Sequence, residues 1–126
     1  MNANEAARRV MALKPALDGW RVYEHTAHGG APPWIVLGVD QTGCDVNEAV
    51  NVTSRRFTLT ARIVGHDAQG VNIVCDRLQD AFDGRHPDGM GALVPYSDSG
   101  VYASELTDPE TSQQYPMRVL TWRFGE

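Results

Sequence analysis

The sequence predicts an α+β fold in which two helices pack on an antiparallel or mixed sheet, in the order α-β-β-β-α-β-β-β. Two segments carry apolar residues at spacings of three and four, residues 55–65 alternate between apolar and polar, and further short apolar segments are separated by glycines and prolines. The chain has 126 residues, 42% of them hydrophobic, so we expect one domain over residues 1–126 with a single core.

The first helix is predicted from Asn4 to about Lys14, with Asn2 or Asn4 as its N-cap. Pro15 disfavours helical geometry at the residue before it, so the regular helix is expected to end there. One face of this segment is apolar and needs a second layer to pack on; its members are Ala6, Val10, Leu13 and Leu17.

Two strands are predicted next, at Trp20–His25 and Trp34–Val39. The first alternates bulky and polar residues, and the second is apolar on both faces, which is typical of a strand inside a sheet. Thr26–Pro33 between them contains two glycines and two prolines, so we expect a turn that joins the two strands in a loose hairpin.

The segment Asp40–Ser54 has no clear period, and two interpretations stay open. It is either a long loop of the kind that often forms a binding element, or it has no such role and is a flexible surface loop or the early start of the next strand, through Val50 and Val52.

The third strand, Arg55–Gly65, has the clearest alternation in the chain. Its two faces are apolar and polar respectively: Phe57, Leu59, Ala61 and Ile63 against Arg56, Thr58, Thr60 and Arg62. The second helix, Gln69–Asp83, is expected to be capped by Asp67 and to end before Gly84. Its apolar face consists of Val71, Val74, Cys75, Leu78, Ala81 and Phe82.

The rest of the chain is expected to contain a loop and three strands. The loop, Arg85–Gly91, holds one proline and two glycines. The strands are Ala92–Tyr96, Val101–Leu106 and Tyr115–Phe124, and one face of the last strand carries Arg118, Leu120, Trp122 and Phe124.

The charge and the apolar runs exclude several classes of protein. A formal net charge of −5 argues against broad affinity for nucleic acid or an anionic membrane. Apolar runs of four residues are too short for a membrane-spanning helix or a signal peptide. With two cysteines a disulfide framework is not expected, so we expect a soluble protein of a reducing cytoplasm.

No catalytic, metal or cofactor site is predicted. His25 and His28, three residues apart at the end of a strand, lack a third ligand at a zinc-site spacing. Cys75 falls on a buried helix face, and the acidic neighbours of Cys44 raise the pKa of a thiol rather than lower it. The common nucleophile, phosphate and dinucleotide motifs are absent from the sequence. The chain is therefore not expected to be an enzyme.

The order of elements from Glu5 to Phe124 resembles one known family. The resemblance is carried by five segments: the short connection Leu17–Tyr23 into the first strand, the glycine- and proline-bearing Gly29–Gly38, the long strand Arg55–Gly65, the helix end Leu78–Phe82 and the aromatic strand Met117–Phe124. In this order and in size the chain resembles the tail-terminator proteins of long-tailed bacteriophages, also called tail-completion, minor tail or head–tail joining proteins.

The resemblance implies a structural protein of the virion, at the head-proximal end of the tail, assembled in the host cytoplasm. Such proteins form a ring of six copies that caps the tail tube, stops its polymerisation and docks the head completion or connector proteins. DNA would pass through the ring without specific binding, and acidic side chains around the hole would repel it. A hole lined mainly by Arg21, Arg55, Arg56 and Arg62 would contradict this expectation.

A ring of identical subunits needs two different surfaces that match. The expected subunit interface joins the polar face of the third strand to the acidic side of the second helix: Arg56, Thr58, Thr60 and Arg62 against Asp76, Asp80 and Asp83. A solvated strand face is the alternative. The two predicted loops are candidates for axial contacts to the tube or connector, through Asp40, Gly43, Asp45, Asn47, Arg85, His86 and Asp88.

Two other functions stay open. The first is a head-closure or neck protein or a tail-tube subunit, which also assemble as rings. The second is a small cytoplasmic ligand-binding or metal-dependent hydrolytic domain, whose pocket would need His25, His28 and Cys44 with Asp40.

Overall fold

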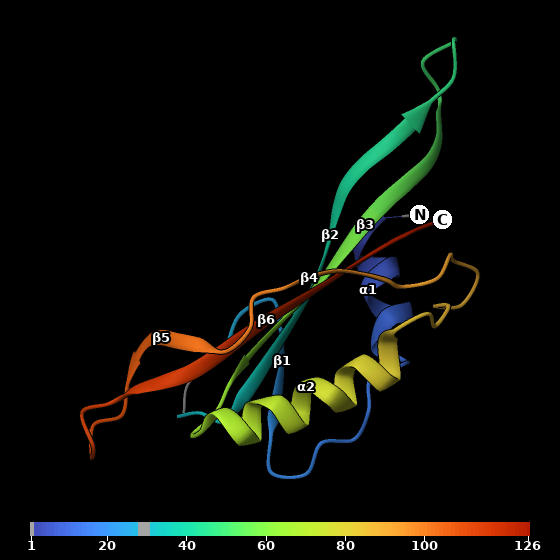
Figure 1. The fold of residues 1–126 in the computed structure, drawn as a ribbon. Helices are drawn as coiled ribbons and strands as arrows, with labels where there is room; N and C mark the ends of the chain where they lie inside the picture. Colours follow the sequence, from blue (N-terminus) through green and yellow to red (C-terminus); the bar gives the residue numbers. More distant parts are fainter. Residues whose placement is uncertain (1, 28–30) are drawn as a thin grey trace.

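The computed structural model describes residues 2–27 and 31–126. It confirms the α+β class: two helices lie against a six-stranded mixed sheet, and the order of elements is the predicted one (Figure 1). The elements are α1 (Ala3–Met11), β1 (Arg21–Glu24), β2 (Trp34–Val46), β3 (Val52–Val64), α2 (Ala68–Phe82), β4 (Val94–Asp98), β5 (Tyr102–Thr107) and β6 (Gln114–Gly125).

The strands are arranged in the order β1-β2-β3-β6-β4, and β5 also pairs with β6. β3 is antiparallel to both of its neighbours, and β4 and β5 pair with successive parts of β6, also antiparallel. β2, predicted to be an interior strand, lies between β1 and β3.

The predicted hairpin between the first two strands is wrong. β1 runs parallel to β2, with Arg21 opposite Trp34 and Glu24 opposite Leu37. The nine-residue connection 25–33 is long enough to return the chain to the level at which β1 began, whereas a hairpin turn would leave it at the opposite end. Glycines and prolines in a sequence indicate a change of direction but not how far the chain travels before it pairs again.

The segment Asp40–Ser54 is not a loop, because β2 and β3 continue through it as a long hairpin of two 13-residue strands (Figure 1). The early start of the third strand is therefore the correct interpretation. Register shifts between Gln41 and Gly43 and between Asp45 and Val46 interrupt the alternation, which explains why the sequence shows no period here.

Both helices begin where the sequence indicated. The Asn2 side chain accepts a hydrogen bond from the Glu5 backbone N–H, and Asp67 accepts one from Gly70 at 2.6 Å. α1 ends at Met11, earlier than predicted, because the chain tightens there and the N–H groups of Leu13 and Lys14 bond three residues back.

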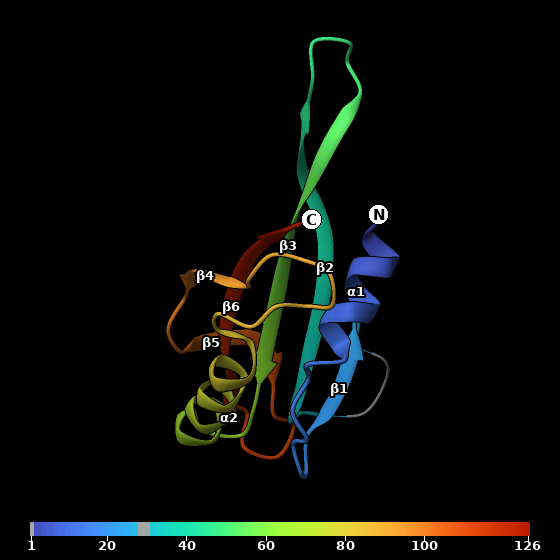
Figure 2. The same cartoon turned by 90° about the vertical axis from the view of Figure 1, so that its right-hand side faces the viewer.

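The core lies between the helices and one face of the sheet (Figure 2). Cross-strand pairing places its aromatic and aliphatic side chains in rows, as in Ile35–Ile63, Leu59–Trp122 and Phe57–Phe124. α1 buries Ala6 and Val10 over β2, and α2 covers β3 and β6 with Val71, Val74, Cys75, Leu78 and Phe82. The predicted apolar face of α2 is thus confirmed, except that Ala81 is half-buried. That of the first helix is confirmed for Ala6 and Val10, whereas Leu13 and Leu17 follow the end of α1 and pack half-buried against the core.

The largest core side chain, Trp122, has a polar atom that needs a partner. Its indole Nε1 donates to Asp83 Oδ1 at 2.6 Å, and its ring meets Phe82 edge to face with centroids 5.2 Å apart. Asp83 is the C-cap residue of α2, so this hydrogen bond ties the end of the helix to β6.

We therefore expect Asp83→Ala to lower the free energy of unfolding by about 1–3 kcal/mol, since it leaves a buried indole N–H without an acceptor. Asp83→Asn, which keeps an acceptor oxygen in the same place, should lose clearly less. Urea unfolding followed by circular dichroism measures both, and equal losses in the two variants would contradict the assigned hydrogen bond.

Candidate assembly surfaces

Because both helices cover one side of the sheet, its opposite side forms a second surface, here called the open face (Figure 2). On β3 this face carries Arg56, Thr58, Thr60 and Arg62, as predicted. The two arginines are exposed and the two threonines are half-buried.

Cross-strand register divides the open face into an apolar end and a charged end. At one end Trp34, Val64 and Met117 form a row, and Val36 lies in the next row beside Arg62. Further along, Asp40 lies opposite Thr58, which lies opposite Arg123. The guanidinium of Arg123 stacks on the Tyr96 ring of β4, 3.4 Å from its centroid.

At the apolar end β5 and the sheet enclose a hollow of about 500 Å³. β5 pairs with β6 at Ala103 and again at Thr107, and the register shift between them lets the intervening residues leave the plane of the sheet. The hollow is lined by Trp34, Val36, Arg62, Val64 and Met117 of the sheet and by 102–106 of β5. Its lining is mostly apolar.

At the other end of the molecule the β2–β3 hairpin extends beyond the rest of the sheet. Gly125, at the end of β6, lies opposite Arg56, so residues 43–55, here called the arm, form a two-stranded ribbon (Figure 1). At about 3.3 Å per residue the arm extends roughly 15 Å beyond β6. A two-stranded hairpin alone is marginally stable in water, so the arm is a natural site for a partner.

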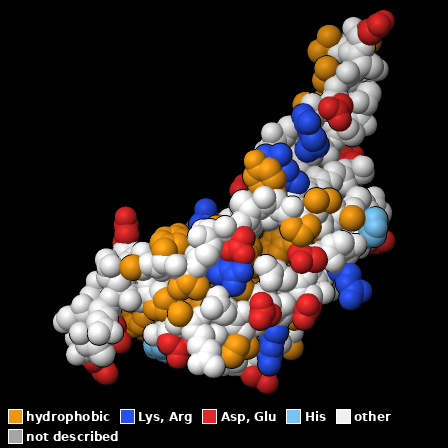
Figure 3. Space-filling model, viewed as in Figure 1, with side chains coloured by type: hydrophobic (Ala, Val, Ile, Leu, Met, Phe, Trp, Pro, Cys, Tyr) orange, Lys and Arg blue, Asp and Glu red, His pale blue; other side chains and the backbone are white. Residues whose placement is uncertain are grey.

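The tip of the arm exposes three valine side chains. Val46, Val50 and Val52 are 55%, 78% and 46% exposed, and Val46 pairs with Val52 across the hairpin (Figure 3). Asn47 builds the turn: its side-chain oxygen accepts hydrogen bonds from the N–H groups of Ala49 and Asn51, each at 3.0 Å. Exposed apolar side chains grouped at the end of a projection are typical of a protein contact.

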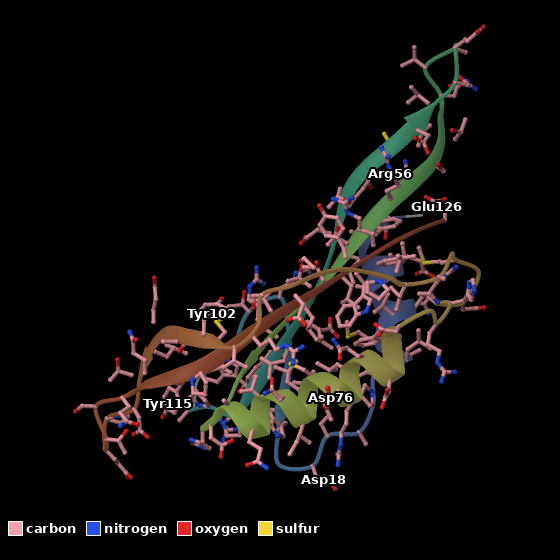
Figure 4. All side chains as sticks on the ribbon, viewed as in Figure 1. Asp18, Arg56, Asp76, Tyr102, Tyr115 and Glu126 are labelled. Carbon is pink, nitrogen blue, oxygen red and sulfur yellow. The ribbon has the colours of Figure 1, made fainter. Side chains whose placement is uncertain are left out.

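The two patches of the predicted subunit interface lie on different layers of the molecule. Asp76 and Asp80 are exposed on α2, away from the open face on which Arg56 and Arg62 lie (Figure 4). One chain therefore cannot bring the patches together, whereas two copies can. Asp83 differs from the other two acids because its carboxylate is bound to Trp122 of its own chain.

The residues predicted for axial contacts fall into two places. Asp40, Gly43 and Asp45 lie in β2 and not in a loop as expected, whereas Asn47 does lie in the turn of the arm. The second group, Arg85, His86 and Asp88, does lie in a loop, between α2 and β4. This loop is fastened to α1, because Arg9 Nη1 donates to the Asp88 carbonyl at 2.7 Å.

Within residues 2–27 and 31–126, no three His, Cys, Asp or Glu side chains are grouped so that they could hold a metal ion. His28, one of the predicted pocket residues, lies outside the described residues. Cys44 is exposed on the arm, and burial raises the pKa of the Cys75 thiol to about 11. In the same part of the chain, no helix is both long and apolar enough to cross a membrane.

One ion pair joins three elements at the edge of the helix layer. Arg118 of β6 binds the Asp98 carboxylate of β4 through two nitrogens, Nε to Oδ1 at 2.9 Å, and its Nη1 donates to Asn72 of α2 at 3.0 Å. The hydrogen bonds from Arg118 lower the pKa of Asp98. The sequence predicted that Arg118 shares a face of the last strand with Leu120, Trp122 and Phe124, but it did not indicate that Asp98 is its partner.

The hollow and the valine tip were missed by sequence reasoning. Tyr102 and Leu106 looked like ordinary strand residues, and only the departure of β5 from the sheet makes them line a hollow. A signal was present for Val50, a bulky apolar residue in a segment that also contains Asn47, Glu48 and Asn51.

A comparison of the sequence with models of protein families found no match, and a comparison with curated proteins found none either.

The Arg118–Asp98 pair predicts a pH dependence of stability. Because the pKa of Asp98 is lower in the folded than in the unfolded chain, the pair stabilises the fold fully above the unfolded value, about 3.9, and this contribution is lost as the pH falls through the folded value. Asp98→Asn should lower the free energy of unfolding by about 1 kcal/mol at pH 7, since Asp98 is partly exposed, and by much less at pH 3.

Thermal unfolding at pH 7, 5 and 3 measures this difference. Asp18→Asn, at an exposed position of the α1–β1 loop (Figure 4), serves as the control. Its unfolding temperature should stay close to that of the parent chain at each pH. A constant gap between Asp98→Asn and the parent across the three pH values would contradict the assignment.

Proposed function

We propose that this chain is a tail-terminator protein of a long-tailed bacteriophage, a structural protein that assembles into a ring, caps the tail tube and docks the head completion proteins. The observation that supports it best is that one chain carries complementary surfaces that it cannot bring together by itself. These are a cationic sheet face, an acidic helix and a projecting arm with exposed valines at its tip. Such surfaces would meet in a head-to-tail contact between copies of the chain. The order of elements, on which the resemblance to this family rests, agrees with the fold.

The lateral contact of the ring joins the open face of one copy to α2 of the next. Arg56 supplies an exposed guanidinium, held weakly by Asp45 at 3.9 Å within its own chain. Asp76 and Asp80 lie one helical turn apart on the exposed side of α2, so both can face the same cation. The guanidinium of an arginine is a planar fork of N–H donors and binds carboxylates well.

The axial contacts involve the α2–β4 loop. Its backbone is held by α1 and by Gly125 of β6, whose carbonyl accepts from the Gly91 N–H at 2.8 Å, so Arg85, His86 and Asp88 are presented on a fastened loop. The net charge of −5 on each chain disfavours tight binding of DNA that passes through the ring.

The mass of the assembled particle tests the proposal. Six copies of the 13.8 kDa chain make a ring of about 83 kDa, which native mass spectrometry and negative-stain electron microscopy would detect. A terminator stops at single rings, whereas a tail-tube protein continues into long polymers. A chain that stays monomeric at all concentrations, alone and with tube ends present, would contradict the proposal.

The lateral contact predicts the effect of charge reversal. Arg56→Glu, and separately Asp80→Arg, should each weaken ring assembly about tenfold or more, because each places like charges opposite one another. The double variant should recover part of the loss, since the pair is restored with its signs exchanged.

Lys14→Glu, at an exposed position on neither surface, is the matched control for a change of two charges and should assemble as the parent chain does. Assembly measured by gel filtration with light scattering decides the result. Unaltered assembly of Arg56→Glu, or no recovery in the double variant, would remove this contact from the proposal.

A further inference from the structure

We propose that the valine tip of the arm of one copy docks into the hollow beside β5 of a neighbouring copy. This inference rests on the proposed assembly into a ring and names the partner of the arm. It assigns Val46, Val50 and Val52 to a contact between identical chains, in place of an axial contact to another protein.

Val50 is the first observation that supports the docking. Its φ of 62° lies in the left-handed region, which a β-branched residue rarely adopts and which glycine or asparagine occupies at lower cost. The turn does not use the Val50 side chain, which is 78% exposed, because Asn47 holds the turn together. A strained backbone that displays an apolar side chain to solvent indicates that this side chain acts on a partner.

The hollow has the complementary chemistry. Its floor contains Val36 and Val64, nearly fully buried, while Tyr102 and Leu106 of β5 are 45% and 41% exposed at its edge. Trp34 and Met117 complete the apolar lining. A small apolar tip can remove Tyr102 and Leu106 from water together with its own three valines.

The positions of tip and hollow require two copies. The arm begins beyond Arg56 at one end of the molecule, and Tyr102 lies toward the opposite end (Figure 4). A chain therefore cannot fill its own hollow, and each copy offers its tip to one neighbour while it receives the tip of another. A contact of this kind is heterologous, as a closed ring requires.

Charge also favours this match. The tip carries Asp45 and Glu48, and the described lining of the hollow has two charged residues, Arg62 and Glu105. Arg62 is exposed on β3, whereas Glu105 belongs to β5. The tip should therefore lie against the β3 side, where Glu48 can approach the guanidinium of Arg62 and stay away from Glu105.

Val50→Asn tests the inference without damage to the fold. Asparagine tolerates the left-handed conformation better than valine, so the variant should unfold no more easily than the parent chain. It should nevertheless raise the concentration needed for half-assembly at least about tenfold, because the most exposed valine of the tip is lost. Val101→Asn is the matched control: Val101, 38% exposed between β4 and β5, lies outside the tip and does not line the hollow, and its variant should assemble normally.

Disulfide trapping locates the partner. In a Cys44→Ser background, one batch of protein carries Val50→Cys and a second carries Leu106→Cys, and the two batches are mixed and oxidised. Covalent dimers that contain one chain of each kind are expected. Val50→Cys mixed with Glu110→Cys, on the turn between β5 and β6, is the control and should give none.

The outcomes separate this inference from the proposed function. Rings that form normally with Val50→Asn, give no mixed dimers and leave the Val50→Cys thiol open to maleimide would overturn the docking while the ring itself stands. Mixed dimers within long filaments would support the docking and contradict a terminator. A chain that neither assembles nor cross-links would overturn both.

Discussion

The pairing of β3 with β6 is the constraint on which the rest of this structure depends. It places Phe57 opposite Phe124 and Leu59 opposite Trp122, so the aromatic side chains of both strands face the helices together. Side chains alternate with a period of two, and a slip of one residue would turn Arg56 and Arg62 into the core and Leu59 outward. The cost of burying two unpaired arginines excludes that register.

The surfaces follow from how far this pairing extends. Where β6 ends, β3 is left with β2 alone and the sheet becomes an arm; where β6 loses its regular pairing to β5, the sheet opens into a hollow. The helices cover neither place, because the arm extends beyond the body of the sheet and the hollow lies on the open face, on the side away from both helices (Figure 2).

Several titratable and polar side chains act within the body of the molecule. Its cysteine with a perturbed pKa, Cys75, is buried and made less reactive by that burial. Two polar interactions, between Trp122 and Asp83 and between Arg118 and Asp98, fasten the helix layer and the β4 edge to β6. For the assembly proposed above, such fastening means that less of the energy of contact would be spent on ordering the subunit.

The sequence by itself determined the elements whose periodicity is uninterrupted. The alternation of residues 55–65 identified both faces of β3, and the spacing of Val71, Val74 and Leu78 identified the buried face of α2, because period and burial are linked within one element. The caps Asn2 and Asp67 were also readable, since an N-cap interacts with residues only three positions away.

Only the tertiary structure decided how separate segments meet. The parallel pairing of β1 with β2, the bulges that hide the arm, and the departure of β5 from β6 depend on contacts between residues far apart in sequence, for which a local pattern has no signal. The candidate surfaces have the same origin. Val50 lies at the tip of an arm because β6 ends before the β2–β3 hairpin does, and Tyr102 lines the hollow because β5 departs from β6. Whether a residue is exposed or lines the hollow depends on the whole sheet, and it cannot be deduced from one segment of the sequence.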